Sequence, residues 1–294
     1  RVLKKSLGYT ALVLGLLGHD FAHAYTGITI VMNTSSAVNQ EFVDSFRQEL
    51  LDAKYTNLRV KVIDLETSEK LVVAENSELV IALGVKALGA SSKLSYSTPV
   101  LGVFTPLPTY NSLLASSRRV LGNFSAIVLD QPNARRLLLI KTILPNVKSV
   151  GVLLGPTSMQ DADNLKEVAE KIDLNINQEN VYQESELIPK LSALLESSDA
   201  LMALPDSFVY SRETAQSILL TSYRHQKPVF GYSQSYVQAG ALAAVYANTK
   251  QLAKQAAEIA MQSQQVIGGL PPPQAPKYFS IMLNRQVGRS LKIQ

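Results

Sequence analysis

The sequence predicts an α/β fold of two Rossmann-like lobes, each built on a parallel sheet. Three observations lead to this prediction. Apolar runs of strand length alternate with helical patterns along the chain, which is typical of parallel sheets with helices on both faces. Polar loops follow the strand-like runs. The 270 residues that remain of 294 without a 24-residue leader also exceed what a single hydrophobic core usually supports.

The chain begins with the pattern of a secretory signal peptide, expected at residues 1–24. Arg1, Lys4 and Lys5 precede an apolar segment from Leu7 to Gly18, and Ala22-His23-Ala24 offers a small-x-small cleavage site. The alternative, a membrane anchor, would need about 20 apolar residues. We therefore expect cleavage before Tyr25 and a periplasmic mature protein.

Cysteine is absent from the chain. The protein therefore has no disulfide framework, no thiol nucleophile and no thiol metal ligand. A lipid-carrying cysteine after the signal is also missing, which favours a free periplasmic protein over a lipoprotein.

The strand-like runs and the helical patterns alternate through the rest of the chain. The expected strands are Gly27–Met32, Leu58–Ile63, Leu79–Leu83, Val100–Phe104, Ser149–Leu154, Ala200–Leu204 and Val229–Gly231. The expected helices are Asn39–Lys54, Leu113–Ser117, Gln131–Ile143, Asp161–Ile172, Glu186–Glu196, Ser211–His225 and Leu252–Ile267. Pro271-Pro272-Pro273 is expected to form a stiff, extended linker, because proline fixes φ and removes a donor.

The charge balance argues against a nucleic-acid partner. The chain has 28 basic and 24 acidic residues, of which the leader holds three and one, so the mature protein has 25 and 23 and a net charge of +2. No basic run of the kind that follows a phosphate backbone occurs.

Four segments resemble those of a known family. They are LLLIKTILPNVKSVGVLLGPTS (Leu137–Ser158), ALPDSFVYS (Ala203–Ser211), KPVFGYSQSYVQAGALAAV (Lys227–Val245) and YFSIMLNRQVGRSLKI (Tyr278–Ile293). In this order, and after a signal peptide, they resemble the ABC-transporter substrate-binding proteins of the tryptophan/tyrosine-binding type. The resemblance implies a type I periplasmic binding protein, that is, a monomer whose two lobes close on a small-molecule solute without a cofactor, and a membrane permease as partner.

The resemblance also implies three crossovers between the lobes. They are expected near Phe124–Asp130, Ser233–Val237 and Gln274–Ser280. Lobe one would then comprise residues 25–124 and 236–275, including Ala241–Tyr246, and lobe two residues 125–235 and 276–294. A cleft between hinged lobes suits a protein that buries its ligand by closing.

The candidate ligand-binding residues follow the expected strands, because ligands of parallel sheets bind at the carboxyl ends of the strands. Lobe one offers Asn33, Ser35, Ser36, Gly84, Val85 and Thr105. Lobe two offers Pro156, Thr157, Asp206, Ser207, Tyr232 and Ser233.

Some of these residues have a structural alternative. Asp206 could pair with an ammonium group of the ligand, or it could begin the following turn and cap its helix. Ser35 and Ser36 could equally be helix caps. Tyr232, Phe104 and Tyr236 could stack on a ligand, although aromatic residues beside strands usually belong to the core.

The sequence departs from the family at two places that concern specificity. Thr105-Pro106-Leu107 stands where family members carry Thr-Asp-Pro, and Ser125-Ala126 stands where they show Thr-Gly. These departures weaken the case for an aromatic amino acid. We expect a small polar or amino-acid-like solute.

An enzymatic function is not supported by the motifs. The histidines are His19, His23 and His225, the first two within the leader, and no Gly-x-Ser-x-Gly, metal-ligand spacing or phosphate-binding loop occurs. We therefore expect no catalytic residues, no metal and no cofactor. Two functions stay open: a receptor that delivers a solute to an ABC permease, and a sensory subunit that signals to a membrane histidine kinase or cyclase.

Overall fold

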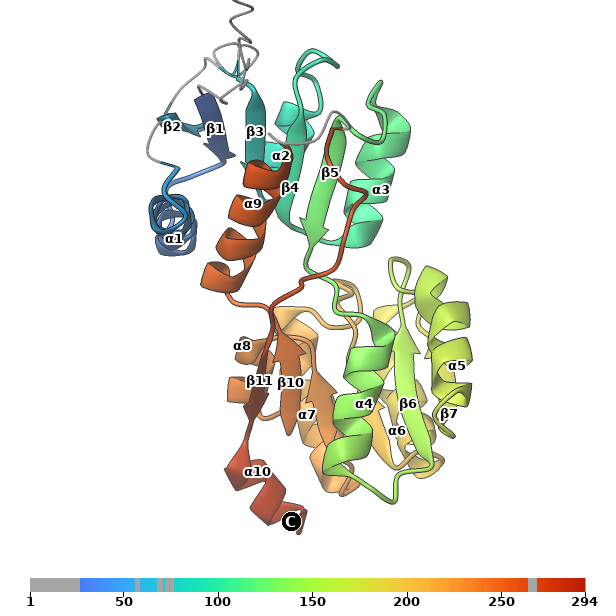
Figure 1. The fold of residues 1–294 in the computed structure, drawn as a ribbon. Coiled ribbons are helices and arrows are strands. Elements are labelled where there is room, and N and C mark those ends of the chain that lie inside the picture. The colour runs from blue at the N-terminus through green and yellow to red at the C-terminus, as the bar shows by residue number, and fades with distance from the viewer. Residues whose placement is uncertain are drawn as a thin grey trace, which may run out of the picture.

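A computed structural model describes residues 27–55, 59–67, 71, 74, 77–263 and 269–293. These residues form two sheets, each covered by helices, and the two lobes lie one above the other in Figure 1. The expected signal peptide lies outside the described residues. Among those that are described, no helix is both long and apolar enough to cross a membrane.

The first sheet has five parallel strands. Their order is β2 (Arg59–Asp64), β1 (Gly27–Met32), β3 (Leu79–Leu83), β4 (Val100–Thr105) and β5 (Phe124–Val128). The three central strands and β5 are almost wholly buried, which explains why they read as continuous apolar runs rather than as alternating patterns.

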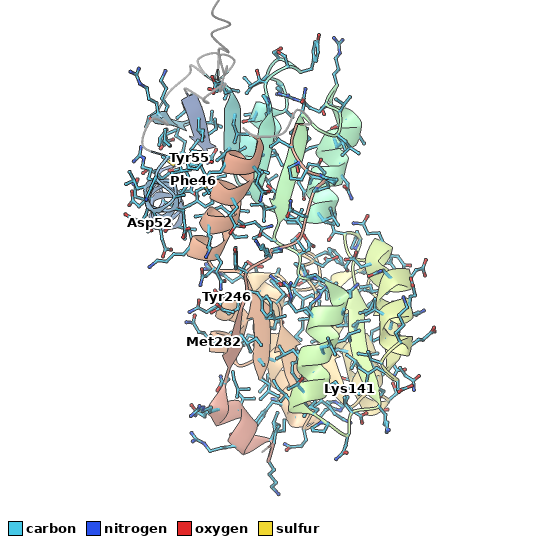
Figure 2. All side chains as sticks on the ribbon, in the orientation of Figure 1. Phe46, Asp52, Tyr55, Lys141, Tyr246 and Met282 are labelled. Carbon is cyan, nitrogen blue, oxygen red and sulfur yellow. The ribbon has the colours of Figure 1, made fainter. Side chains whose placement is uncertain are left out.

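Helices cover both faces of this sheet. α2 (Val85–Ser91) and α3 (Leu107–Ser116) pack on one face, where Leu88 and Tyr110 are buried. α1 (Ala37–Asp52) and α9 (Thr249–Ser263) cover the other face. α9 packs closely on α1 with a buried face that is rich in alanine, and Phe46 of α1, labelled in Figure 2, is fully buried.

The second sheet has six strands, of which five are parallel. Their order is β11 (Ser280–Leu283), β10 (Ala243–Tyr246), β9 (Val229–Gly231), β8 (Ala200–Met202), β6 (Ser149–Leu154) and β7 (Asn175–Asn180). β11 runs antiparallel to β10 at one edge. The helices of this lobe are α4 (Asn133–Ile143), α5 (Ala162–Glu170), α6 (Leu187–Glu196), α7 (Arg212–Arg224), α8 (Gln234–Ala239) and α10 (Arg285–Ser290), with short 3-10 turns at Met159–Asp161 and Glu184–Glu186.

The chain passes between the sheets three times, after β5, after β10 and before β11. The last passage lies beside β5: Val128 N–H donates to the Gln274 carbonyl at 3.0 Å, and Gln274 N–H donates to the Ala126 carbonyl at 2.9 Å. The segment that follows the prolines thus extends the first sheet before it enters the second.

The structure corrects the expected course of the chain at two crossovers. Ala241–Tyr246 was expected in lobe one, but β10 lies between β9 and β11 in the second sheet, so the second crossover follows Tyr246 and not Ser233–Val237. The reason is α8, a six-residue helix that ends at Gly240 with φ +129° and returns the chain to the strand beside β9. β5 likewise belongs to the first sheet, so the first crossover begins after Val128.

The alanine face of α9 should resist enlargement. In Ala257→Leu the added methyl groups have no space against α1, and we expect the free energy of unfolding to fall by about 1–3 kcal/mol. Urea unfolding followed by circular dichroism measures this change. Ala134→Leu on the exposed face of α4 is the matched control and should change stability by about 0.5 kcal/mol or less. Equal stability of the two variants would show that α9 does not pack closely.

Candidate functional site

The carboxyl ends of the parallel strands in the two sheets point toward each other (Figure 1). A cavity of about 210 Å³ lies where the lobes meet. Tyr246, labelled in Figure 2, lies at this junction. The cavity is lined by the segments after β4 and β5, by α4, and by the carboxyl ends of β8, β9 and β10. The lining residues are Pro106, Leu129, Gln131, Arg136, Pro205, Tyr232, Ser233, Val245, Tyr246 and Ala247.

Two of the twelve residues proposed from the sequence, Tyr232 and Ser233, line this cavity. Tyr232 donates from its hydroxyl to the Tyr210 carbonyl at 3.2 Å, which fixes its ring. Ser233 caps α8 by accepting from Tyr236 N–H at 3.2 Å. Tyr236 itself is buried in the core, as aromatic residues beside strands usually are.

The lobe-one candidates lie at the rim of the first sheet. Asn33 donates to the Glu66 carboxylate at 3.1 Å, and Ser36 caps α1 by accepting from Asn39 N–H at 3.2 Å, while Ser35 is exposed. Gly84, at φ +87°, begins α2, and Val85 beside it is exposed. Ligand contact by these residues stays a prediction.

Thr105 differs from the other lobe-one candidates because it is completely buried. The strand β4 bulges between Val103 and Thr105, and Phe104 adopts a left-handed φ of 58°. This bulge turns the Thr105 side chain away from the rim, and the ring of Phe104 packs edge-on against Phe42 at 5.6 Å.

Asp206 is the most heavily hydrogen-bonded carboxylate of the lobe-two loops. One oxygen accepts from Phe208 N–H at 2.9 Å and Val209 N–H at 3.2 Å. The other accepts from the backbone N–H groups of Thr157 and Ser158, at 3.2 and 3.0 Å, and from their hydroxyls, at 2.8 and 2.9 Å. The side chain is only 1% exposed.

Asp206 therefore braces the loops after β6 and β8 against each other. The structure shows Asp206 in the turn-forming role, in which it accepts six hydrogen bonds, and ligand contact by Asp206 stays a prediction. Gly155 makes the arrangement possible: a Cβ there would lie 2.6 Å from Asp206 Oδ1. Pro156, Thr157 and Ser207 are exposed on either side of this brace.

The sequence reasoning missed two buried polar side chains that line the cavity, Gln131 and Arg136. Both are 6% exposed. Arg136 donates from Nη2 to Asn133 Oδ1 at 2.6 Å, but its Nε has no hydrogen-bond partner, nor has Gln131 Nε2. Arg136 lies four residues before the buried Ile140 of α4, so helical spacing could have placed this arginine on the apolar face.

Burial lowers the pKa of Arg136, while the negative charges of Asp161 and Asp130 act in the opposite direction. Neither carboxylate forms an ion pair with it, because the ion pairs among the described residues are Lys171–Glu167, Lys190–Glu186 and Lys277–Glu258. The guanidinium remains charged at neutral pH, since its pKa starts far above 7.

Arg135 holds the first and third crossovers together. Its Nη1 donates to Gln131 Oε1 at 2.6 Å and to the Pro276 carbonyl at 2.9 Å. Its guanidinium lies 4.0 Å from the centre of the Phe279 ring, a cation–π contact.

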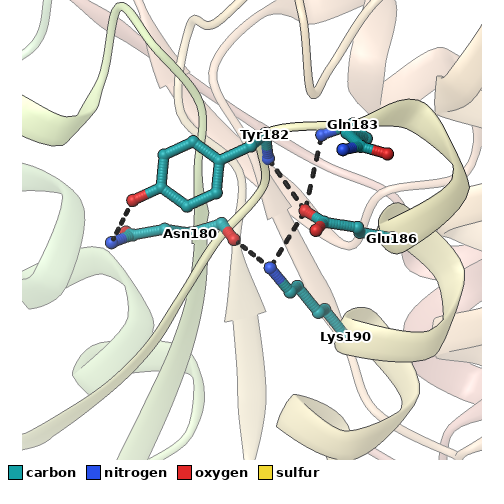
Figure 3. A network of polar contacts seen from close by, with 5 residues as sticks. All are labelled: Asn180, Tyr182, Gln183, Glu186 and Lys190. Carbon is teal, nitrogen blue, oxygen red and sulfur yellow. Dashed lines mark hydrogen bonds and ion pairs between the residues drawn. The ribbon is translucent and has the colours of Figure 1, made fainter.

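A second polar network fixes the loop at the carboxyl end of β7 (Figure 3). Glu186 accepts from Tyr182 N–H at 3.0 Å and from Lys190 at 3.0 Å, and Lys190 also donates to the Asn180 carbonyl at 2.6 Å. Glu186 and Gln183 form a capping box at the start of the 3-10 turn Glu184–Glu186, which directly precedes α6. The network shapes the edge of lobe two and does not reach the junction cavity.

Comparisons with known proteins agree with this architecture. Residues 29–294 match the family model for the ABC transporter substrate binding protein. A Clostridium difficile substrate-binding protein with adhesive properties, in its ligand-free, open structure, is 17% identical with a TM-score of 0.72, and an ABC domain from Streptococcus pneumonia in complex with L-Trp is 18% identical with a TM-score of 0.62. In both cases the match covers 92% of this chain and 95% of the other. No curated protein matches the sequence.

Removing the charge of Asp206 should destabilise lobe two. Asp206→Asn leaves at least one N–H or hydroxyl donor without an acceptor, and we expect a loss of about 2–4 kcal/mol in urea unfolding at pH 7. Asp44→Asn on the exposed face of α1 is the matched control and should stay within about 0.5 kcal/mol.

The pH dependence gives Asp206 a second readout. Burial raises its pKa, but the hydrogen bonds from Thr157, Ser158, Val209 and Phe208 outweigh burial, so the pKa lies below its ordinary value. A carboxylate with a lowered pKa adds stability above its unfolded pKa of about 3.9 and loses it as the pH falls further. The wild type should therefore lose stability below about pH 4 more steeply than Asp206→Asn. Parallel acid profiles of the two proteins would contradict the brace.

Proposed function

The chain belongs to the ABC transporter substrate-binding protein family, and we propose that it is the periplasmic receptor that delivers one small solute to the permease of an ABC uptake system. Proteins of this family bind solutes and are not enzymes. The observation that carries the proposal is the junction cavity, whose walls come from the strand ends of both lobes. A ligand seated there touches both lobes and so favours their closure.

We propose that the lobes move as two bodies about the three crossovers. Lobe one would comprise residues 27–128 and 249–274, and lobe two residues 133–246 and 280–293. The short segments between them would absorb the rotation, as hinge residues do in proteins that close around a ligand.

The polar loops at the strand ends would complete the site on closure. Asn33, Ser35 and Gly84 follow strands of lobe one, and Thr157 and Ser207 follow strands of lobe two. Closure would bring these loops toward the solute. Their small polar side chains suit a small polar ligand.

Solute binding should stabilise and compact the protein. In a thermal-shift screen of residues 25–294 against amino acids, organic acids, nucleosides, vitamins and sugars, a ligand at about a hundred times its dissociation constant adds about 2.7 kcal/mol, or roughly 5–10 °C in Tm. Small-angle X-ray scattering of the same sample should show a smaller radius of gyration.

A matched pair of tyrosine variants locates the site. Tyr232→Ala removes a wall of the junction cavity and should weaken binding of the identified solute at least tenfold. Tyr223→Ala, on the exposed surface of α7 and away from that cavity, should leave affinity unchanged. Absence of any hit after unfolding and refolding to remove a carried-over ligand would contradict the proposed function.

A further inference from the structure

We infer that the junction cavity selects a solute that carries a carboxylate and an apolar body but no ammonium group, with Arg136 and Gln131 as the residues that bind the carboxylate. The inference rests on the proposed function and names the chemical class of its solute.

Arg136 carries a buried positive charge that forms none of the ion pairs among the described residues. A buried guanidinium is costly to a folded protein unless hydrogen bonds and a counter-charge satisfy it. Arg136 is nine-tenths buried, donates to the neutral Asn133 amide and keeps an Nε without a partner. Arg136 also lines the cavity, so a carboxylate there would supply the missing counter-charge, in the planar geometry that guanidinium groups favour.

The acidic residues near Arg136 do not replace this ligand. Asp130 accepts from Leu107 N–H at 2.6 Å and thereby holds the start of α3, and Asp161 lies at the start of α5. Both favour the charged guanidinium, but neither lies within ion-pair distance of it. Their field keeps Arg136 protonated and leaves its donors for the solute.

Arg135 fixes the orientation of the Gln131 side-chain amide. Arg135 can only donate, so the Gln131 oxygen must face Arg135, where the distance to Nη1 is 2.6 Å. The Gln131 amide nitrogen then points the other way and has no partner. Gln131 and Arg136 thus line the cavity as two polar side chains that no carboxylate pairs with there, and we infer that their N–H groups receive the carboxylate of the solute.

The rest of the cavity wall has no negative charge. No aspartate or glutamate lines the cavity, and Asp206, the one carboxylate expected there from the sequence, already accepts six hydrogen bonds. An ammonium group would find no counter-charge on this wall and would face Arg136. The remaining surface is apolar or aromatic, with Pro106, Tyr232 and Tyr246 suited to a hydrocarbon body.

Two matched sets of probes test this inference by titration calorimetry. Hydrocinnamate, L-phenylalanine and phenethylamine share one aromatic body, and isocaproate, L-leucine and isoamylamine share one aliphatic body. Within each set the first has only a carboxylate, the second has both groups, and the third has only an ammonium group. We expect the acid of at least one set to bind at least tenfold more tightly than its amino acid, and the amines not to bind.

Arg136→Gln should weaken binding of that acid by about tenfold or more, the loss of a charge-assisted hydrogen bond. Arg136→Lys should recover part of the affinity, because the charge returns without the planar donors. Arg224→Gln removes the same charge at the exposed last turn of α7 and should bind like the wild type. Urea unfolding without solute separates a binding role from a structural one, since Arg136→Gln should be no less stable than the wild type.

The outcomes separate this inference from the proposed function. Tighter binding of an amino acid than of its acid, or equal binding of the acid by wild type and Arg136→Gln, would overturn the carboxylate site. A sugar, nucleoside or vitamin that binds both proteins equally, while no acid binds, would also overturn it but would leave the solute receptor in place. Failure of every probe and every class in the solute screen would overturn both.

Discussion

The fold depends on three chain crossings being held side by side at one place. Arg135 links the first crossing to the third, and Gln255 of α9 secures the third by donating to the Gln274 oxygen at 3.1 Å and accepting from Lys277 N–H at 2.7 Å. Gln251, one turn earlier, donates to the Ser280 hydroxyl at the start of β11. Because these side chains use both of their polar ends, the crossings stay in register, and the strand ends of the two sheets are kept facing one another.

The two buried charges near the junction, Asp206 and Arg136, differ in how completely the protein satisfies them with hydrogen bonds. Asp206 has every lone pair engaged by the loops around it, so burial of its charge serves the architecture of lobe two. Arg136 is buried to a similar degree, yet one of its donors is unused. Natural proteins rarely leave a buried donor unpaired, and such groups point to a missing partner. This contrast is the reason why we propose a binding role for Arg136 and a structural role for Asp206.

The sequence predicted the fold more completely than the site, for physical reasons. Central parallel strands such as β3 and β6 are buried on both faces, and their apolar runs are unmistakable. β7, with the sequence NINQEN, and β11 are the two edge strands of the second sheet, and their residues are exposed or only partly buried. Neither strand was predicted, because neither forms a buried apolar run. The prediction for β10 named the wrong lobe, because the apolar sequence of a strand indicates that it is buried but not which strands it pairs with. Candidates chosen because they follow a strand include Tyr232 and Ser233, which line the cavity. The same criterion could not select Gln131, which lies on a crossover, or Arg136, which lies on a helix.

The position of Arg136 also bears on how a solute could drive closure. A ligand shifts the equilibrium between open and closed forms only as far as it binds one form better than the other. Arg136 belongs to α4 of the second lobe, whereas Pro106 and Leu129 across the cavity follow strands of the first. A solute whose charged group is held by Arg136 gains its apolar contacts with Pro106 and Leu129 only when the lobes approach. Charge would thus place the solute on one lobe, and burial of its hydrocarbon would bring the other lobe onto it.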